Sequence, residues 1–277
     1  MTTVGIATGA GRGMGLTCAQ RLTGMVDTLL LIDLNEATVT AAAKDLSATA
    51  GGAVEPFVLD ITDGDGLSRL AARVAELGTL RAVAHAAGIS PTMADWRRIL
   101  TVDLVGTAML AEALRPLATA GTAMVFFASM APLLGGIGPD PAADAVLDDP
   151  LGERFLERLH ETLGPALEDP GLAYSWAKRG VHRFVQQEAV RLGPVGARVC
   201  SVSPGIIDTP QGRQEAASHP SMDRLVQQTP LRRTGRPEDV AAVVAFALSA
   251  EAGFLSGIDL LVDGGLCAAV HGRSRGQ

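Results

Sequence analysis

Short apolar runs alternate with longer amphipathic stretches along almost the whole chain, and this alternation constrains the fold more than any other feature. Seven runs are predicted to be strands: Val4–Thr8, Thr28–Asp33, Val54–Asp60, Arg81–Ala86, Met124–Ser129, Arg198–Val202 and Asp259–Val262. Helical periodicity appears between them, for example in Leu67–Leu77 and Pro237–Ser249. Such alternation is typical of parallel strands joined by right-handed crossovers. Near-continuous apolar strands also indicate a sheet covered on both faces. We therefore expect an α/β fold with a doubly wound parallel sheet.

The length and composition favour one large domain. We expect it to span residues 1–270, followed by a disordered tail at 271–277. A net charge of −7 argues against nucleic acid and anionic membrane surfaces as partners. Cys18, Cys200 and Cys267 are scattered without a C-x-x-C pair, so we expect a reducing compartment and no metal site. The N-terminus lacks a secretory signal pattern, which favours a cytoplasmic protein.

One uncharged stretch, Pro116–Pro139, is long enough to cross a bilayer, and the mean hydropathy of the chain is +0.25. Pro132 and several glycines interrupt this stretch, and its pattern fits a strand followed by a turn and a loop. We therefore interpret it as part of the sheet and expect no membrane span.

A glycine-rich turn, Thr8–Gly15, follows the first strand and opens a helix. Glycines at such a turn let the backbone approach a pyrophosphate, which then sits at the helix N-terminus. Asp33 ends the second strand, where a carboxylate holds ribose hydroxyls and repels a 2′-phosphate. The pattern therefore favours NAD over NADP. Arg12 is interpreted in three ways: as a solvated loop residue, as a pyrophosphate contact, or as a contact to a 2′-phosphate.

Tyr174 is the one tyrosine of the chain, and Lys178 is one of its two lysines. Residues four apart share one face of a helix, so the phenol and the ammonium point the same way. A nearby cation favours the phenolate and lowers the pKa of the tyrosine. The pair is therefore interpreted either as a solvated helix face or as an acid/base pair, and the scarcity of lysine favours the second interpretation.

With these residues in place, the sequence resembles the short-chain dehydrogenase/reductase family over almost its whole length. The motifs that carry the resemblance are Thr8, Gly9, Gly13 and Gly15; Asp60; Ser129; Tyr174 and Lys178; Pro204–Thr209; Gly235–Ala241; and Val262–Gly265. The resemblance implies a Rossmann-type fold. It also implies cofactor contacts from Gly9, Arg12, Gly13, Met14, Gly15, Asp33, Leu34, Asp60, Ile61, Ala87, Gly88, Tyr174, Lys178, Pro204, Gly205, Ile207 and Thr209.

The same resemblance implies a mechanism. Tyr174 acts as the general acid/base, Lys178 lowers its pKa and holds the nicotinamide ribose, and Ser129 orients the reacting oxygen. Ser129 taken alone fits a hydroxyl that caps a turn. The Thr209 hydroxyl and the Ile207 backbone hold the carboxamide of the nicotinamide.

Two positions depart from the family pattern. An N-N-A-G segment usually follows the fourth strand, and here it reads His85-Ala86-Ala87-Gly88. We interpret His85 as a packed strand residue and expect the side-chain support of the neighbouring strand to be lost. Asp103 stands where the family has a helix asparagine of a proton relay, and we expect its carboxylate either to maintain the relay or to pair with Lys178.

Ser129 and Tyr174 lie 45 residues apart, further than is usual in the family. We expect residues 131–172 to hold a helical insertion, with Asp149 as N-cap, Pro150 in the first turn, and an apolar stripe after them. It is interpreted either as a surface helix packed on the core or as an interface or lid. An insertion at this place resembles the bacterial 3α-hydroxysteroid dehydrogenase/carbonyl reductase subgroup.

Residues 205–235 are expected to form a variable substrate lid, and Leu225, Leu231 and Leu134 predict an apolar pocket. The resulting hypothesis is an NAD-dependent enzyme that interconverts a hydrophobic secondary alcohol and its ketone. Two alternatives are an NADPH-dependent 3-oxoacyl thioester reductase and a catalytically silent dinucleotide-binding protein. The resemblance also implies a homodimer or homotetramer.

Overall fold

The computed structural model describes residues 1–134, 136–218 and 221–274. Seven parallel strands form one sheet in the order β3-β2-β1-β4-β5-β6-β7. They are β1 (Thr3–Thr8), β2 (Thr28–Asp33), β3 (Ala53–Val58), β4 (Thr79–His85), β5 (Ala123–Phe127), β6 (Arg198–Pro204) and β7 (Asp259–Val262). The predicted doubly wound sheet is confirmed. In such sheets ligands bind at the carboxyl ends of the strands where the order reverses, here between β1 and β4.

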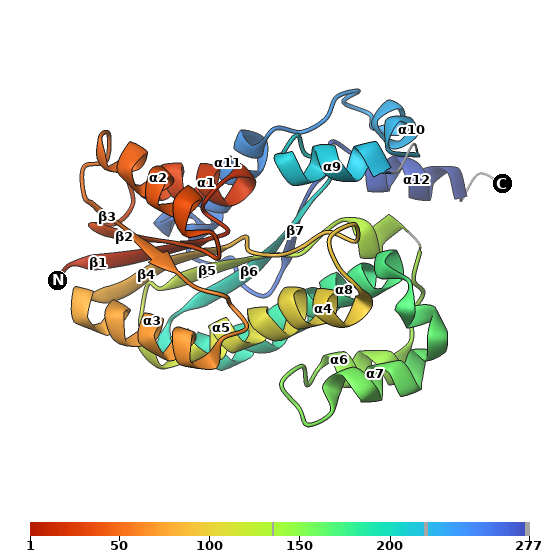
Figure 1. The fold of residues 1–277 in the computed structure, drawn as a ribbon, viewed down its shortest axis with the longest axis horizontal. Coiled ribbons are helices and arrows are strands. Elements are labelled where there is room, and N and C mark those ends of the chain that lie inside the picture. Colours follow the sequence, from red (N-terminus) through yellow and green to blue (C-terminus); the bar gives the residue numbers. More distant parts are fainter. Residues whose placement is uncertain (135, 219–220, 275–277) are drawn as a thin grey trace.

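Helices cover both faces of the sheet (Figure 1). One face carries α1 (Gly13–Leu22), α2 (Glu36–Ser47) and α11 (Pro237–Leu248). The other carries α3 (Gly64–Leu77), α4 (Trp96–Leu100), α5 (Gly106–Leu114) and α8 (Pro170–Leu192). Each layer of helices forms a buried apolar cluster with the strands beneath it. The central strands therefore bury both faces, which explains why their sequences are apolar without alternation.

Strand β3 ends before its predicted boundary. It stops at Val58 rather than Asp60. The backbone N–H and the hydroxyl of Thr62 donate to the Asp60 carboxylate at 2.9 and 2.7 Å, which turns the chain immediately after the strand. This turn places Asp60 at the wall of the crevice instead of in the sheet.

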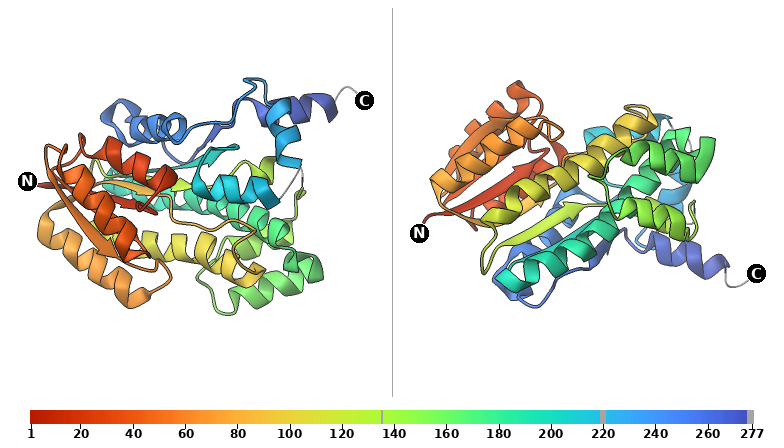
Figure 2. Two further views of the ribbon diagram at one scale, coloured as in Figure 1. Left: turned by 45° about the horizontal axis from the view of Figure 1, so that its top comes forward. Right: turned by 90° about the horizontal axis from the view of Figure 1, so that it is seen from below.

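The predicted helical insertion contains α6 (Pro141–Leu147) and α7 (Phe155–Leu163). Both views of Figure 2 place it at the end of the molecule away from the N-terminus. A short 3-10 turn, Gly164–Glu168, connects α7 to α8. The insertion therefore adds two helices to the Rossmann-type sheet without adding a strand.

The predicted helix start at Asp149 and Pro150 is wrong. The Asp140 carboxylate instead accepts the N–H groups of Ala142 and Ala143, both at 3.0 Å, and caps α6. Asp149 lies in the turn after α6, where its carbonyl accepts the N–H of Gly152 at 3.1 Å. The two Asp-Pro pairs carry the same local signal, and the surrounding packing selects one of them.

Two bidentate ion pairs hold the insertion against α8. Arg179 binds Asp144 at 2.6 and 2.7 Å, and Arg183 binds Asp148 at 2.7 and 2.6 Å. Phe155 at the start of α7 is 4% exposed and joins the apolar cluster on this face. The insertion therefore packs on the core, as the first of its two interpretations requires.

The segment after β6 crosses the carboxyl end of the sheet with α9 (Pro210–Ser218), α10 (Ser221–Gln228) and, after β7, α12 (Leu266–Ser274). The prediction of a disordered tail at 271–277 is wrong for residues 271–274, because α12 continues to Ser274, while 275–277 lie outside the described residues. Asp263 starts this helix by accepting the N–H groups of Gly265 and Cys267 at 2.8 and 2.7 Å. Within the described residues, no helix is long and apolar enough to cross a membrane.

Candidate active site

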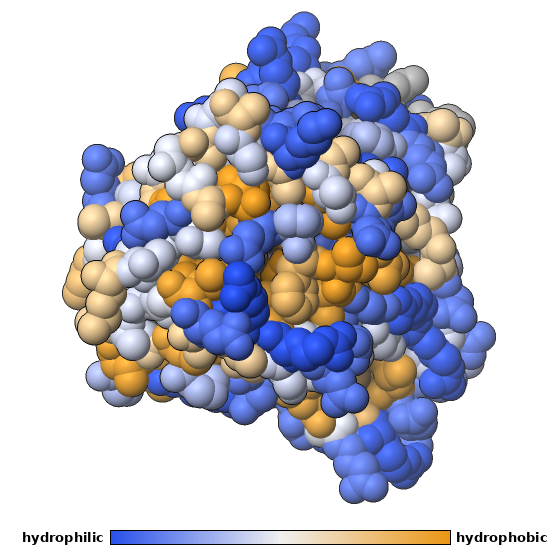
Figure 3. Space-filling model, turned by 60° about the vertical axis from the view of Figure 1, so that its left-hand side comes forward, coloured by the Kyte–Doolittle hydropathy of each residue, from blue (hydrophilic) through white to orange (hydrophobic). Residues whose placement is uncertain are grey.

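A cavity of about 850 Å³ opens at the carboxyl ends of the strands. The loops that follow β1 through β6 supply most of its wall. A space-filling view shows apolar side chains gathered at the centre of one face, within a surround of hydrophilic residues (Figure 3). Every residue predicted to contact the cofactor lines the cavity, together with Ser129, whereas Asp103 lies behind its wall.

The glycine-rich turn needs glycine at two positions for steric reasons. Gly9 has a φ of +62°, and a Cβ there would lie 3.0 Å from the backbone nitrogen of Ala87. A Cβ at Gly15 would come within 2.2 Å of the Gly9 carbonyl oxygen. The turn is therefore tightly folded against the loop after β4. It brings the N-terminus of α1, a favourable place for a phosphate, to the cavity wall at Gly13 and Met14.

Two carboxylates mark the other end of the cavity. Asp33 accepts the N–H of Gly11 at 2.9 Å and that of Asn35 at 3.0 Å, one on each oxygen, which fixes its orientation at the end of β2. Asp60 is bound by Arg98 at 2.9 Å. Burial would raise the pKa of Asp60, but the bonds from Thr62 and Arg98 outweigh it and hold that pKa below its usual value.

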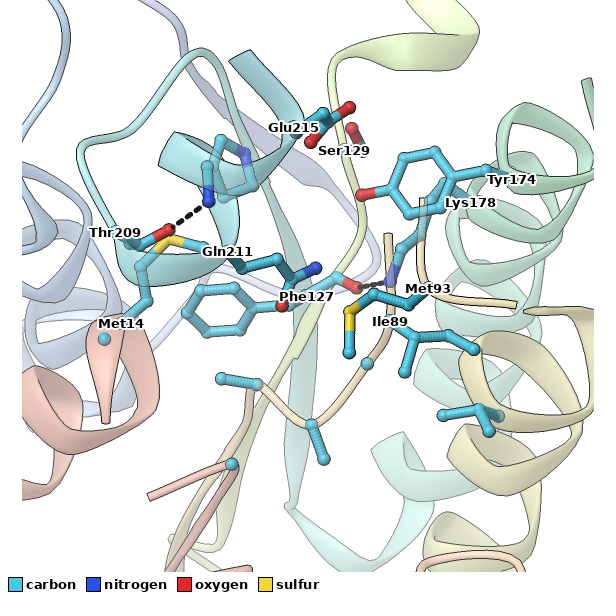
Figure 4. Close-up of a pocket in the computed structure, with 18 of the residues that line it drawn as sticks. Met14, Ile89, Met93, Phe127, Ser129, Tyr174, Lys178, Thr209, Gln211 and Glu215 are labelled. Atoms are coloured by element: carbon cyan, nitrogen blue, oxygen red, sulfur yellow. Dashed lines mark hydrogen bonds between the residues drawn. The ribbon is translucent and has the colours of Figure 1, made fainter. Parts of the chain in front are cut away.

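Three side chains meet at the opposite end of the cavity (Figure 4). Tyr174 and Lys178 project from the same face of α8, and Ser129 follows β5. The Lys178 ammonium lies 5.5 Å from the centre of the Tyr174 ring and donates to the Phe127 carbonyl at 3.1 Å. The hydroxyl of Ser129 is close enough to the phenol to favour its ionised form. The predicted triad is therefore assembled in one place.

Asp103 pairs with Lys178 from behind the cavity. One carboxylate oxygen lies 3.3 Å from the ammonium nitrogen, and the other accepts the N–H of Ile89 at 2.8 Å. Burial raises the pKa of Asp103, although Lys178 and the Ile89 amide oppose that rise. Asp103 lies in a single π-helical turn, Thr101–Val105, between α4 and α5. Such turns often occur at functional sites.

The electrostatic surroundings of Tyr174 differ from the prediction. We expected Lys178 to lower the pKa of the phenol, but burial raises that pKa well above its usual value, and the charges of Asp103 and Glu215 raise it further. Burial is the largest cause of the raised pKa, and Asp103, which pairs with Lys178 at 3.3 Å, adds a negative charge that also disfavours the phenolate. In the protein alone, Tyr174 is therefore a protonated phenol near neutral pH.

His85 does support its neighbours, which corrects the expectation that this support is lost. Its Nδ1 lies 2.7 Å from the Thr8 hydroxyl, and its Nε2 lies 3.0 Å from the Thr107 hydroxyl. The Ala87 N–H donates to Thr8 at 3.0 Å, and Thr107 donates to the Asp103 carbonyl at 2.8 Å. These directions fit one tautomer, with the proton on Nε2. A single buried chain of hydrogen bonds thus joins the loop after β4 to the π-helical turn.

The loop after β6 completes the same end of the cavity. Thr209 accepts the N–H of Gly212 at 2.9 Å, and so caps the start of α9 while its hydroxyl faces the cavity (Figure 4). Gly235 donates to the Ile206 carbonyl at 2.9 Å and accepts the Asp208 N–H at 2.8 Å. The predicted C-terminal motif that begins at Gly235 therefore fixes the loop that carries Ile207 and Thr209.

Several wall residues were missed by the sequence analysis, among them Ile89, Met93, Arg98, Gln211 and Glu215. Gln211 and Glu215 are four residues apart on α9, a spacing that places both on one face of a helix. That spacing was the one available signal. In contrast, Leu231, which was expected in the pocket, is 64% exposed and does not line it, and neither α6 nor α7 contributes to the wall.

These features fit a dinucleotide. A glycine-rich turn at a helix N-terminus accepts a pyrophosphate, oriented carboxylate oxygens at Asp33 accept ribose hydroxyls, and Lys178 with Thr209 can donate at the far end. The fold and the site together define a dinucleotide-binding oxidoreductase with a Tyr-Lys-Ser centre.

Comparison with known proteins identifies the family. A family model described as enoyl-(acyl carrier protein) reductase matches residues 9–140 and 165–267. The chain is 30% identical to a cis-4-hydroxycyclohexanecarboxylate dehydrogenase of Sinomonas cyclohexanicum over 96% of both chains. It is 32% identical to a short-chain dehydrogenase/reductase of Alternaria brassicicola over 94% of both. The chain therefore belongs to the short-chain dehydrogenase/reductase family, whose members bind nicotinamide dinucleotides.

The solved structures agree with this assignment. A short-chain type dehydrogenase/reductase from Mycobacterium ulcerans superimposes with a TM-score of 0.77 at 26% identity, covering 96% of this chain and 90% of that one. The gap in the family match, residues 141–164, coincides with α6 and α7. The insertion therefore lies outside the segments that the family model matches, and the site residues all lie in the matched segments or just before them.

Proposed function

We propose that this protein is an NAD-dependent oxidoreductase that interconverts a hydrophobic secondary alcohol and its ketone. The observation that carries the proposal is the meeting of Ser129, Tyr174 and Lys178 at one end of a cavity whose other end presents Asp33. Each group stands where the reaction needs it, because the acid/base and the ribose-binding carboxylate lie at opposite ends of a space that suits an extended dinucleotide.

In the reduction of a ketone, each of the three residues has its own proposed role. A bound nicotinamide supplies the hydride to the carbonyl carbon. Ser129 donates a hydrogen bond to the carbonyl oxygen and orients it. Tyr174 delivers its proton to the same oxygen as negative charge develops there, so the alcohol leaves neutral. Lys178 stabilises the resulting phenolate and donates to a ribose hydroxyl. Oxidation of the alcohol reverses these steps.

Cofactor choice is proposed to rest on Asp33. Its two oxygens are held by the amides of Gly11 and Asn35, which supports a fixed carboxylate at the ribose end of the cofactor, close to where a 2′-phosphate would bind. Repulsion between two fixed anions then disfavours NADPH. Arg12 also lines the cavity, and we assign it to the pyrophosphate because Asp33 occupies the ribose end.

The substrate is proposed to be a cyclic or bulky ketone. Ile89, Met93, Leu134 and Leu225 give the wall beyond the reacting centre an apolar character. The relative from Sinomonas cyclohexanicum is named for a ring that carries a secondary alcohol and a carboxylate. An apolar wall next to a Tyr-Ser pair fits such a ring better than a flexible sugar chain.

A 3-oxoacyl thioester is the second candidate substrate. The matching family model is described as enoyl-(acyl carrier protein) reductase, which favours an acyl substrate. This candidate is an NADPH-dependent reduction of the 3-oxo group, and Asp33 opposes NADPH. The choice between the two candidates therefore coincides with the choice of cofactor.

We also propose that the protein forms a homodimer through the edge of the sheet at β7. Within the part of the chain that the structure describes, this strand pairs with β6 alone and its outer edge is open, and Leu261 on it is 43% exposed. Phe246, Phe254 and Ile258 near it are 48%, 106% and 42% exposed. An open strand edge with apolar side chains is usually covered, and a second copy of the chain supplies a matching edge.

The experiment that tests the function is nicotinamide absorbance with a ketone panel. The panel contains a steroid ketone, a cyclic terpenoid ketone, an aryl ketone and a 3-oxoacyl thioester, each with NADH and then NADPH. We expect NADH-dependent turnover of at least one cyclic or aryl ketone. The matched variant Asp33→Asn keeps the shape of the side chain and is expected to raise the use of NADPH relative to NADH at least tenfold. Turnover of the thioester with NADPH alone would instead establish the second candidate.

A further inference from the structure

One cation in the wall of the cavity has no part in the proposed mechanism. Arg98 lies on α4 and lines the cavity together with Asp60 and Ile61, which follow β3. The Leu59 N–H donates to the carbonyl of Asp33 at 3.1 Å, so this wall begins directly beside the carboxylate assigned to the ribose. A dinucleotide whose ribose is held at Asp33 therefore has the wall at Asp60 and Arg98 available for its base.

Arg98 joins α4 to the turn after β3. Its guanidinium donates to one oxygen of the Asp60 carboxylate at 2.9 Å and to the Thr62 hydroxyl at 3.3 Å. The other oxygen of Asp60 accepts the Thr62 N–H at 2.9 Å and the Thr62 hydroxyl at 2.7 Å. Burial, the largest single effect, would raise the pKa of Asp60, but these bonds together hold that pKa below its usual value. Asp60 is therefore an ionised and oriented acceptor at the cavity wall.

The Asp60–Arg98 pair keeps hydrogen-bonding capacity for a ligand. A carboxylate has about four acceptor directions, and the bonds from Thr62 and Arg98 occupy three of those on Asp60. In the described part of the chain, the direction that is left belongs to the oxygen that Arg98 holds. The guanidinium has more N–H donors than the two used in these bonds. An acceptor and a donor thus stand side by side at this edge of the cavity.

Apolar side chains form the surfaces next to this polar edge. Val102 follows Arg98 by about one helical turn, and both Val102 and Ile61 line the cavity while only 7% and 4% exposed. Apolar surfaces with hydrogen-bonding groups at one edge suit a purine, because a base has π-faces and a polar edge. The edge of adenine carries an amino donor at C6 beside a ring-nitrogen acceptor at N1. It therefore complements the acceptor of Asp60 and the donor of Arg98.

We infer that Arg98 is a base-recognition residue, which selects adenine in the cofactor by donating to N1 while Asp60 accepts from the 6-amino group. The inference rests on the proposed function, since it concerns the cofactor of the same site. Hypoxanthine carries an oxygen at C6 and a proton on N1, so it would set acceptor against acceptor and donor against donor. A site whose polar groups are left unpaired by a ligand discriminates strongly against that ligand.

The test compares NADH with reduced nicotinamide hypoxanthine dinucleotide, which differs from NADH only in that base. The nicotinamide fluorescence of both compounds gives their dissociation constants without any ketone present. In the wild type we expect the hypoxanthine dinucleotide to bind at least about tenfold more weakly than NADH. Arg98→Met keeps an unbranched side chain but removes the donors. In this variant the gap should narrow to about threefold, because Asp60 is still held by Thr62.

Arg97→Met is the matched control, because it removes the same charge one residue away on the same helix. The guanidinium carbon of Arg97 lies 4.3 Å from the centre of the Trp96 ring, and one of its nitrogens lies 3.5 Å from a Glu157 oxygen. Arg97 does not line the cavity, so we expect this variant to keep the wild-type gap. If both variants narrowed the gap equally, the net charge or the stability of α4 would be responsible, and the assignment to Arg98 would be overturned.

The outcomes separate this inference from the proposed function. If the gap were absent in the wild type, or unchanged in Arg98→Met, while the protein still reduced a ketone of the panel, the inference would be overturned and the function would stand. A gap that depends on Arg98 in a protein that turns over no ketone would do the reverse. Failure of NADH itself to bind would overturn both.

Discussion

The carboxylate of Asp103 lies 3.3 Å from the ammonium of Lys178, and both side chains are almost completely buried. Two different structural features place the two side chains next to each other. Lys178 follows Tyr174 by one turn of α8, and Asp103 is turned inward by the π-helical turn that interrupts the α4 and α5 helices. Gly88 lets the loop after β4 cover the pair, since a Cβ there would lie 3.1 Å from Asp103 and 3.4 Å from Lys178.

The first prediction concerns this carboxylate. Asp103→Asn keeps the acceptor for the Ile89 N–H but removes the charge that raises the pKa of Tyr174. Alcohol oxidation needs the phenolate, so the acid limb of its pH–rate profile should move to lower pH. The measurement is kcat/KM for alcohol oxidation across pH. An unmoved profile would show that the carboxylate has no special part in the chemistry.

The second prediction concerns the buried hydrogen-bond chain through His85. His85→Phe removes both bonds and leaves the hydroxyls of Thr8 and Thr107 without the imidazole. We expect a loss of about 2–4 kcal/mol in the free energy of unfolding, because buried polar groups without partners are costly. Urea unfolding measures it. Thr107→Val serves as the second arm of a double-mutant cycle, in which the combined loss should be smaller than the sum of the two. If the losses in unfolding free energy of the two single variants simply added in the double variant, His85 and Thr107 would not be energetically coupled.

The third prediction follows from the burial of the same imidazole. Burial, with the charge of Lys178 adding to it, lowers the pKa of His85 to about 3. An unfolded histidine titrates near 6.5. Since the folded pKa is the lower one, the stabilising contribution is complete above about pH 6.5 and is lost as the pH falls towards 3.

Over that interval the wild type should lose up to about 1.4 kcal/mol of unfolding free energy per pH unit from this group. His85→Phe cannot titrate there, so its stability should fall less steeply between pH 6 and 4. Urea unfolding of both proteins over this range measures the difference. Parallel curves would mean that His85 is protonated in the folded state.

The fourth prediction tests assembly. Phe254 is fully exposed in the segment that leads into β7, so Phe254→Asp should convert the proposed dimer into a monomer without unfolding it. Val195→Asp, at another exposed apolar position, provides the control. Sedimentation velocity should find a dimer for the wild type and the control, and a monomer for Phe254→Asp. A dimer in all three would place the interface elsewhere.

The sequence predicted the sheet and most of the site because both depend on short, regular patterns. The apolar run at Leu29–Ile32 and the turn at Gly9 are defined by neighbours a few residues away, and both are confirmed in the structure. Tyr174 and Lys178 lie four residues apart on one helix, and that spacing alone predicts that they share a face.

The features that were missed depend on contacts between distant segments. Asp140 and Asp149 each precede a proline, and their local patterns do not distinguish them, although only the first caps a helix. The raised pKa of Tyr174 depends first on how deeply the phenol is buried and then on the nearby charge of Asp103, and both depend on the folded structure. Glu215 lies in a polar helix whose sequence does not show which face turns inward.

The most direct test of the account compares Tyr174→Phe with the wild type in NADH-dependent reduction of the best ketone of the panel. The change removes one oxygen atom and leaves the ring that Lys178 faces. We predict a fall in kcat of at least about 100-fold, as expected for loss of a general acid. The dissociation constant of NADH should stay within about twofold of the wild-type value. A variant that retained most of the wild-type kcat would contradict the assignment of Tyr174 as the proton donor.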